Sequence, residues 1–417
     1  MDLEDSQNTE TPTTTEVAAL PDDPLTLLRK QNLAMIYNKI VDRWPRRNFR
    51  HHELQTLLMQ ATEDHKKVNF NPDHLITRRD AFHFLALLPL EIAGLSALGS
   101  KPKASPEEIL TQCAAGVMGC WYMVRGHKVF TDYIVRSKEL AAASDAVSAY
   151  IPVLTEIADS SSTQHSKAAS DLLVQCFLLK ASIARDIKGT NEGIYYTHQA
   201  EKYSSNATNP MLRVLALRTL SSVYAYTNHW GLALQTAEEA QQIVEDAEKE
   251  REGTILYFVQ SYLYSGLATY QGRMGQVQNA LTSIGKAHEA LERSKKEMKP
   301  IWVDHSPVNL LLNDGVAQLH LGLFAEAIAS FEKTNELPRG GIGDAEILIN
   351  EVMAEVQRED QRDMEWCMNR WTRGITKAVA LQSDQWYNEA CTAYMAMRAA
   401  WPTEQRIKEL RDHIVHW

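Results

Sequence analysis

The sequence of 417 residues has few cysteines and no long apolar run, and both absences narrow the class of protein. Its cysteines are an odd number, are widely spaced and form no CxxC pair; they are Cys113, Cys120, Cys176, Cys367 and Cys391. This usage argues against a disulfide framework or a zinc knuckle and suits a reducing compartment. No stretch approaches the ~18 uncharged apolar residues of a membrane span, and the acidic first 24 residues lack the features of a secretory signal. We therefore expect an intracellular protein, cytoplasmic or nuclear, without membrane contact.

The residue patterns of common catalytic and cofactor sites are also missing. No GxGxxG or GxxxxGK[ST] motif occurs, and His51-His52-Glu53 lacks the spacing of the two histidines in an HExxH zinc site. Cys113 and Cys120 are seven residues apart, which is the spacing of buried apolar thiols on one helix face. We therefore predict no catalytic residue, no metal ligand and no cofactor. An enzyme with its site inside the helical array is the least favoured alternative.

The net charge of −10 is unevenly distributed along the chain. Residues 1–24 contain seven acidic residues and no Lys or Arg, and their Thr-rich composition predicts a disordered acidic tail. Residues 25–103 contain 13 Lys and Arg against 7 Asp and Glu, which gives a basic helical segment with a charge of +6. The remaining residues, 104–417, therefore carry −9 and are a poor electrostatic match for nucleic acid. Only the basic segment is suited to phosphate contacts.

A cluster of cations with an interleaved aromatic ring lies within this basic segment. Arg46, Arg47 and Arg50 surround Phe49 and precede two histidines. Such a cluster can hold an anionic partner. Three interpretations stay open, namely a solvated surface cluster, contact with nucleic acid and intramolecular docking of the acidic tail.

From Pro106 onward the pattern is helix after helix, rich in Ala, Leu and Gln, without a convincing alternating strand. The clearest segment is LLNDGVAQLHLGLFAEAIASFEKTNELP, residues 311–338. Small and large residues alternate in it at positions suited to two packed helices joined by a tight turn; these are Gly315, Gly322, Phe324, Ala327, Phe331 and Pro338. The segment resembles the tetratricopeptide (TPR) helix-turn-helix repeat.

Weaker copies of the same segment place a small residue at the corresponding position, namely Gly193, Ala233, Ala280, Ala327 and Ala390. The steps between them are 40, 47, 47 and 63 residues, compared with about 34 in a standard repeat. These elongated copies are similar to the divergent TPR arrays of signalling proteins and transcription regulators. The resemblance implies an all-α fold, in which residues 104–417 form a right-handed superhelical array of antiparallel helix pairs.

The resemblance also implies a binding function, because the first helix of each pair lines the concave face of a TPR superhelix. Equivalent positions of three pairs supply side chains suited to an extended peptide or a helix, and aromatic anchors contribute most of the affinity at such surfaces. The candidate contacts are Arg218, Tyr226, Tyr262, Arg273, Asn309, Asn313 and His320. We predict a non-enzymatic scaffold or regulatory adaptor that binds a protein or peptide. The alternative is a ligand-sensing regulator of transcription or signalling with residues 25–103 as its output.

Overall fold

The computed structural model of the protein describes residues 105–125, 133–160, 163–187, 190–250, 255–337, 343–358, 362–380 and 383–414. The predicted acidic tail and basic segment lie outside these residues, and so do Arg46, Arg47, Arg50 and Pro338. Within the described ranges every regular element is a helix. The predicted all-α class is confirmed.

The α-helices of the described residues follow one another through short connections. In chain order they are α4 Pro106–Arg125, α5 Tyr133–Ala158, α6 Thr163–Ile187, α7 Thr190–Ser204, α8 Pro210–Tyr226, α9 Trp230–Glu250, α10 Tyr257–Arg273, α11 Val277–Arg293, α12 Pro307–His320, α13 Phe324–Lys333, α14 Gly343–Gln357, α15 Met364–Ala380, α16 Asp384–Ala400 and α17 Gln405–Glu409. Short 3₁₀ turns, Ser294–Lys296, Thr334–Glu336 and Leu410–His413, follow α11, α13 and α17.

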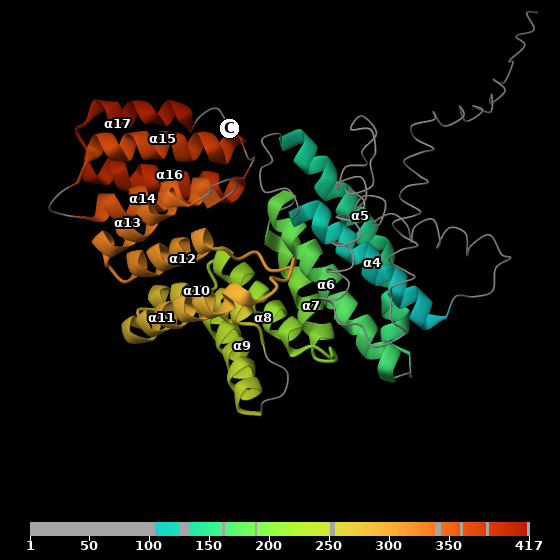
Figure 1. Ribbon diagram of the computed structural model, residues 1–417. Coiled ribbons are helices and arrows are strands. Elements are labelled where there is room, and N and C mark those ends of the chain that lie inside the picture. Colours follow the sequence, from blue (N-terminus) through green and yellow to red (C-terminus); the bar gives the residue numbers. More distant parts are fainter. Residues whose placement is uncertain are drawn as a thin grey trace, which may run out of the picture.

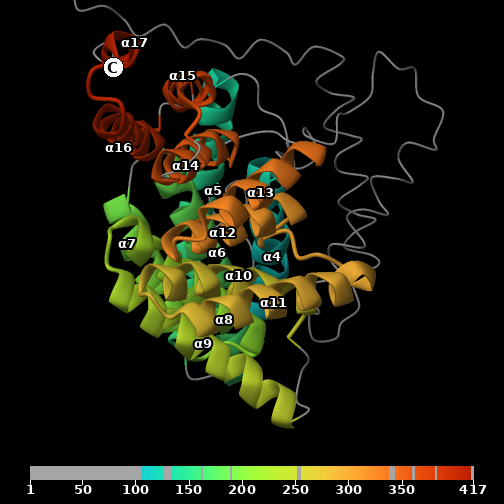
Figure 2. The same cartoon turned by 90° about the vertical axis from the view of Figure 1, so that its left-hand side faces the viewer.

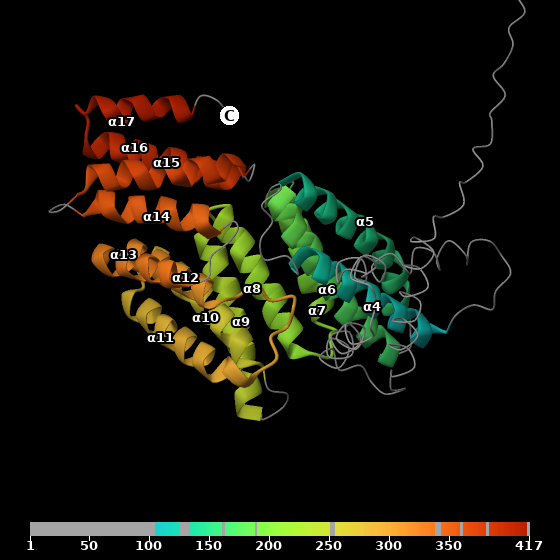
Figure 3. The same ribbon diagram turned by 45° about the horizontal axis from the view of Figure 1, so that its top comes forward.

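The helices form an array of antiparallel pairs, as predicted. Each helix packs on its neighbour in sequence, and the even-numbered helices from α4 to α16 also pack on one another. In Figure 1, α10 to α17 are stacked in one arm, α4 to α7 stand in a second arm, and α8 and α9 lie between them. Figures 2 and 3 show the same order from two other sides. The right-handed sense of the superhelix stays a prediction.

In three successive pairs, α8–α9, α10–α11 and α12–α13, the two helices are joined by the same kind of turn, and this turn recurs every 47 residues. Its central residues, Asn228, Gly275 and Gly322, have φ angles of 61°, 72° and 77°. A residue in this left-handed conformation ends a helix because the following N–H then reaches back to a free carbonyl of the last turn. These bonds are His229 N to Tyr224 O at 2.9 Å, Gln276 N to Gln271 O at 2.8 Å and Leu323 N to Gln318 O at 2.9 Å. The next helix begins two residues after each central residue.

The small residues of the repeat lie where the odd-numbered helices begin. Gly193, Ala233, Ala280 and Ala327 are all buried, each at the third position after the first residue of its helix. The assignment of Ala390 to the same position is wrong, because Ala390 lies on α16, an even-numbered helix. The equivalent residue is Cys367 of α15, which is 0% exposed and follows Ala327 by 40 residues. The step of 63 residues therefore spans an extra helix.

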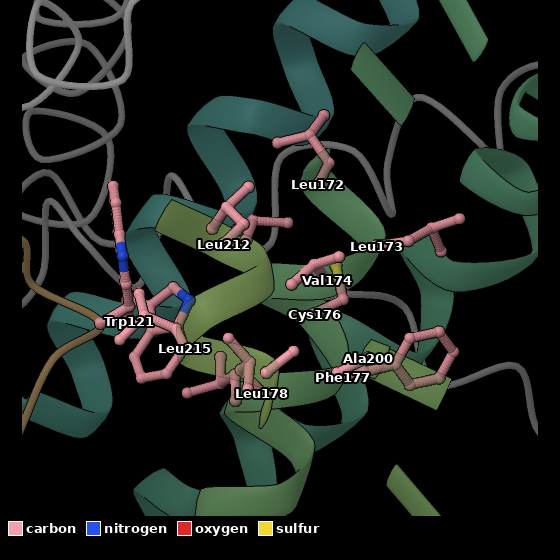
Figure 4. Close-up of a cluster of buried hydrophobic side chains, with 14 of the residues drawn as sticks. Trp121, Leu172, Leu173, Val174, Cys176, Phe177, Leu178, Ala200, Leu212 and Leu215 are labelled. Carbon is pink, nitrogen blue, oxygen red and sulfur yellow. The ribbon is translucent and has the colours of Figure 1, made fainter. Parts of the chain in front are cut away.

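The largest apolar core joins α4 to α8 and extends to α10. Figure 4 shows part of it, with Trp121 of α4, Leu173 and Cys176 of α6, and Leu212 of α8. Cys113 and Cys120 are buried in this core, as predicted, and both thiols are free. Burial raises the pKa of Cys113 to about 12, so this thiol stays protonated and unreactive. A second core around the fully buried Trp371 holds α14 to α16 together.

One helical segment of the described residues has the length and composition of a membrane span, although it contains Asp145 and Glu156 and is therefore not an uncharged apolar run. This segment is Leu140–Ala158 of α5. It packs on α4 and α6, and its buried side chains, among them Val147 and Leu154, belong to the same core as those of these two neighbours.

Candidate binding face on the even-numbered helices

Two neighbouring even-numbered helices present the same spacing of side chains, 47 residues apart. On α10 these residues are Tyr262, Gly266, Thr269 and Arg273. On α12 they are Asn309, Asn313, Val316 and His320. Steps of four, three and four residues keep side chains on one face of a helix. We call these eight residues the even-helix stripe. It contains no Asp or Glu, so Arg273 gives it a positive charge.

At one end of the stripe a cation, an imidazole and an indole are in contact. The Arg273 Nη1 atom lies 3.2 Å from His320 Nδ1, and the Arg273 guanidinium lies 5.1 Å from the ring centroid of Trp230. Because guanidinium is always a donor, Nδ1 accepts and His320 is neutral. Burial and the charge of Arg273 lower the pKa of His320 to about 4. Arg273 remains exposed at the surface.

In the middle of the stripe hydroxyl and amide groups connect α10 with α12. Thr269 Oγ1 donates to Asn313 Oδ1 at 3.3 Å, and Asn313 Nδ2 donates to the carbonyl oxygen of Asn309 at 2.7 Å. Asn309 accepts from the Ser306 hydroxyl, which caps α12. These bonds fix both amides, and no acceptor within the described residues takes the second N–H of Asn313.

Arg218 lies beneath the stripe rather than on it. It is 4% exposed, and its Nη1 donates to Tyr270 Oη at 2.8 Å while its Nε donates to the Tyr262 carbonyl at 3.1 Å. The guanidinium also lies 4.5 Å from the Tyr262 ring centroid. Gly266 gives it room, since a Cβ there would lie 2.3 Å from the guanidinium. Arg218 therefore supports the ring of Tyr262 and holds α8 on α10.

The position of Arg218 follows from the repeat register. The residue 47 positions before Gly266 is Thr219, whereas Arg218 is one position earlier. A single residue turns a helix by about 100°, which takes Arg218 away from the face of the stripe and into the core. Tyr226 does stand in register, 47 residues before Arg273, and is half-buried in the last turn of α8.

His305 lies next to the even-helix stripe, and no pattern in the sequence predicts this position. It is 7% exposed and lies between Phe258 and Tyr262, with ring centroids 5.5 and 5.7 Å away. Its Nε2 contacts Ser261 Oγ at 2.9 Å, and that hydroxyl donates its hydrogen to Ala287 O. Nε2 is therefore the donor. Burial and the charge of Arg218 lower the pKa of His305 to about 3, so the ring stays neutral beneath Tyr262.

Six of the seven candidate residues, all except Tyr226, thus belong to three groups that share α10. Tyr262 rests on Arg218 and His305, Asn309 and Asn313 are joined to Thr269, and Arg273 pairs with His320. Together they offer an aromatic surface, an amide donor and an exposed cation on fixed helices. This set can bind carbonyl and carboxylate acceptors beside an apolar anchor.

No protein-family model matches the chain, and no curated protein matches it. Among solved structures, a Rap protein complexed with Competence and Sporulation Factor has 13% sequence identity and a TM-score of 0.46, covering 94% of this chain and 89% of that one. The apo form of RapI has 11% identity and a TM-score of 0.48, covering 92% and 98%. A phAimR-ligand structure has 11% identity and a TM-score of 0.41, covering 90% and 93%. With TM-scores below 0.5, these likenesses assign no ligand or activity to this chain.

Proposed function

We propose that the chain is a non-enzymatic scaffold or regulatory adaptor that binds a peptide or a protein segment along the even-helix stripe. The observation that carries the proposal is the 47-residue repetition of the stripe on α10 and α12. Its polar groups are held by bonds between the two helices, and all of them except the buried Thr269 are half-buried or exposed. A preorganised surface of this kind lowers the entropic cost of binding.

The chemistry of the stripe favours a segment with an aromatic or aliphatic anchor and acceptor groups near it. Tyr262 provides the apolar surface, Asn313 provides an amide donor for a backbone carbonyl, and Arg273 provides a charge for an acidic side chain. The absence of acidic residues from the stripe removes the repulsion that such a side chain would meet.

A selection of random-sequence peptides displayed on phage, made against the full chain, tests the proposal. We expect enriched peptides whose binding falls about tenfold or more in Tyr262→Ala and Asn313→Ala, since anchor truncations cost over ~1 kcal/mol. Tyr195→Ala and Asn279→Ala are matched controls, because these residues are exposed on the odd-numbered helices α7 and α11. Equal loss in the control variants, or no loss in Tyr262→Ala and Asn313→Ala, would overturn the assignment.

The compartment that we propose is an intracellular, reducing one. All five cysteines lie in the described residues and all are free thiols. Four of them are buried, which suits an environment where no disulfide is needed. Contact with nucleic acid through residues 25–103 stays a separate prediction, which a gel-shift titration with Arg46, Arg47 and Arg50 replaced would test.

A further inference from the structure

A buried lysine lies on the side of α6 that α5 and α7 flank, away from the even-helix stripe. Lys180 is 9% exposed. Its Nζ lies 2.9 Å from Ser144 Oγ and 2.9 Å from Ser148 Oγ, both on α5. On the other side, Nζ lies 5.0 Å from the ring centroid of Tyr196 on α7. Three helices therefore surround one ammonium group.

After the hydrogen bonds among Lys180, Ser144 and Ser148 are assigned, two neighbouring donor hydrogens are left. Ser148 Oγ donates its only hydrogen to the carbonyl oxygen of Ser144 at 2.7 Å, so it accepts from Lys180. Ser144 also accepts from Lys180, and its own hydroxyl hydrogen is not used in the described residues. Lys180 has three N–H groups and gives two of them to the serines. One ammonium hydrogen and the Ser144 hydroxyl hydrogen thus remain.

The positive charge of Lys180 has no partner of opposite sign in the part of the chain that the structure describes. Its only polar contacts there are the two serine hydroxyls and the tyrosine ring. Lys377, whose side chain is more exposed than that of Lys180, instead lies 3.0 Å from Asp344 Oδ2. Removing a cation from water without a counter-charge is unfavourable, and an anion beside Lys180 would offset this cost.

Some of the residues around the ammonium reach the surface. Ser148 is exposed and Ser144 is half-buried on α5. On α7 the ring of Tyr195, which is 59% exposed, lies beside Tyr196 at 5.3 Å between centroids. Because Ser144 and Ser148 contact the same ammonium, a group bound beside the exposed Ser148 would lie near both Lys180 Nζ and the Ser144 hydroxyl.

We propose that Lys180, Ser144 and Ser148 form a binding site for a carboxylate group, separate from the even-helix stripe. The two remaining hydrogens match the two oxygens of one carboxylate. A phosphate dianion carries more charge and more acceptor oxygens than these two donors satisfy. The carboxylate comes either from a small organic acid or from an acidic side chain of a polypeptide.

Thermal unfolding of the full chain tests the site with three probes, sodium acetate, poly-glutamate and inorganic phosphate, each at ionic strength matched with chloride. The variants are Lys180→Met and the smaller change Ser144→Ala, which preserves the fold if the first does not. Lys202→Met is the matched control, because Lys202 also lies 5.0 Å from a tyrosine ring centroid, that of Tyr203, but is exposed.

We expect a carboxylate probe to raise the unfolding midpoint of the wild-type chain and of Lys202→Met, and at least half of this rise to be lost in Ser144→Ala and all of it in Lys180→Met. A response to acetate indicates a small acid, and a response to poly-glutamate alone indicates a polypeptide. Equal shifts in all variants, no shift with either carboxylate, or a larger Lys180-dependent shift with phosphate would overturn the proposal. The Tyr262→Ala variant should respond as the wild type does, so failure of this site and failure of the stripe are distinguishable.

Discussion

Arg273 and His320 are 47 residues apart in the sequence, and their side-chain nitrogens Nη1 and Nδ1 are 3.2 Å apart in the structure. They occupy the same position of two successive repeats, on α10 and α12. Residues at equivalent positions of two successive repeats are therefore in direct contact. Burial keeps His320 neutral, and the guanidinium charge of Arg273 also opposes protonation of the ring.

This contact predicts the titration of His320. The pKa of His320 is about 4 in the folded chain, and Arg273→Leu should raise it toward the ordinary 6.5 by removing the nearby charge. Since the folded pKa is lowered, the contribution of His320 makes the folded state lose stability as pH falls from about 6.5 to about 4. A ¹H NMR titration of the histidine ring protons measures the shift, with exposed Arg213→Leu as control. An unchanged midpoint in Arg273→Leu would refute the coupling.

Arg218 should behave as a structural residue. Arg218→Met removes the bonds to Tyr270 and to the Tyr262 carbonyl from a buried position. We expect a loss of about 2 kcal/mol or more in the free energy of unfolding, since buried charged hydrogen bonds are costly to break. Arg213→Met, which removes an exposed pair with Glu239, should change it by less than about 1 kcal/mol. Urea unfolding measures the free energy of unfolding of both variants. Equal losses in Arg218→Met and Arg213→Met would contradict a structural role of Arg218.

The repeat requires a residue without a side chain at Gly315. A Cβ at this position would lie 2.3 Å from a ring carbon of Phe331. Gly315→Ala should therefore lower the free energy of unfolding by about 1–3 kcal/mol, because the ring must move in a filled core. Gly285→Ala is the matched control on α11, where nothing lies within 4 Å, and should raise it by up to about 1 kcal/mol. The idea fails if both substitutions change stability in the same direction.

His288 and Asp314 should link adjacent repeats in a pH-dependent way. His288 Nε2 on α11 lies 2.5 Å from Asp314 Oδ2 on α12, and the Asp314 side chain is buried. The bond to this carboxylate raises the pKa of His288, although Lys333 on α13 opposes it. The resulting stability is full below pH ~6.5 and is lost as pH rises through the folded pKa.

The test of this pair is His288→Gln, which should lower the free energy of unfolding by about 1 kcal/mol at pH ~5.5 and by less at pH ~9. Lys249→Gln, in an exposed pair with Asp246, serves as control and should have little effect at either pH. Urea unfolding at the two pH values gives the comparison. A loss that grows with pH would contradict the assignment.

The sequence predicts the repeat where its signals are local. Gly315, Gly322, Ala327 and Phe331 belong to the helix pair α12–α13, as their pattern indicates. Each of them serves either the turn between these two helices or the place where the two helices cross. The sequence pattern does not reveal the repeat position on α15, because a buried cysteine, Cys367, stands there in place of alanine. A small residue is recognisable by type only while it stays Ala or Gly.

Contacts between repeats are harder to predict than contacts within one. Arg218 lies one residue before the position that is equivalent to the stripe, and it is buried. The polar character of the residue in the sequence does not reveal this shift. The pairing of Lys180 with two serines depends on how α5 lies against α6, and their residues are 36 and 32 positions apart. Such juxtapositions follow from the packing of helices, because ridges and grooves set which side chains meet.

Hydrogen exchange of the full chain, with and without a selected peptide, is the most direct test of binding through the even-helix stripe. We predict slower amide exchange in α10 and α12, with α11 and α13 unchanged, and no such protection in the Tyr262→Ala/Asn313→Ala double variant. Protection confined to the odd-numbered helices, or equal protection in the double variant, would contradict the account.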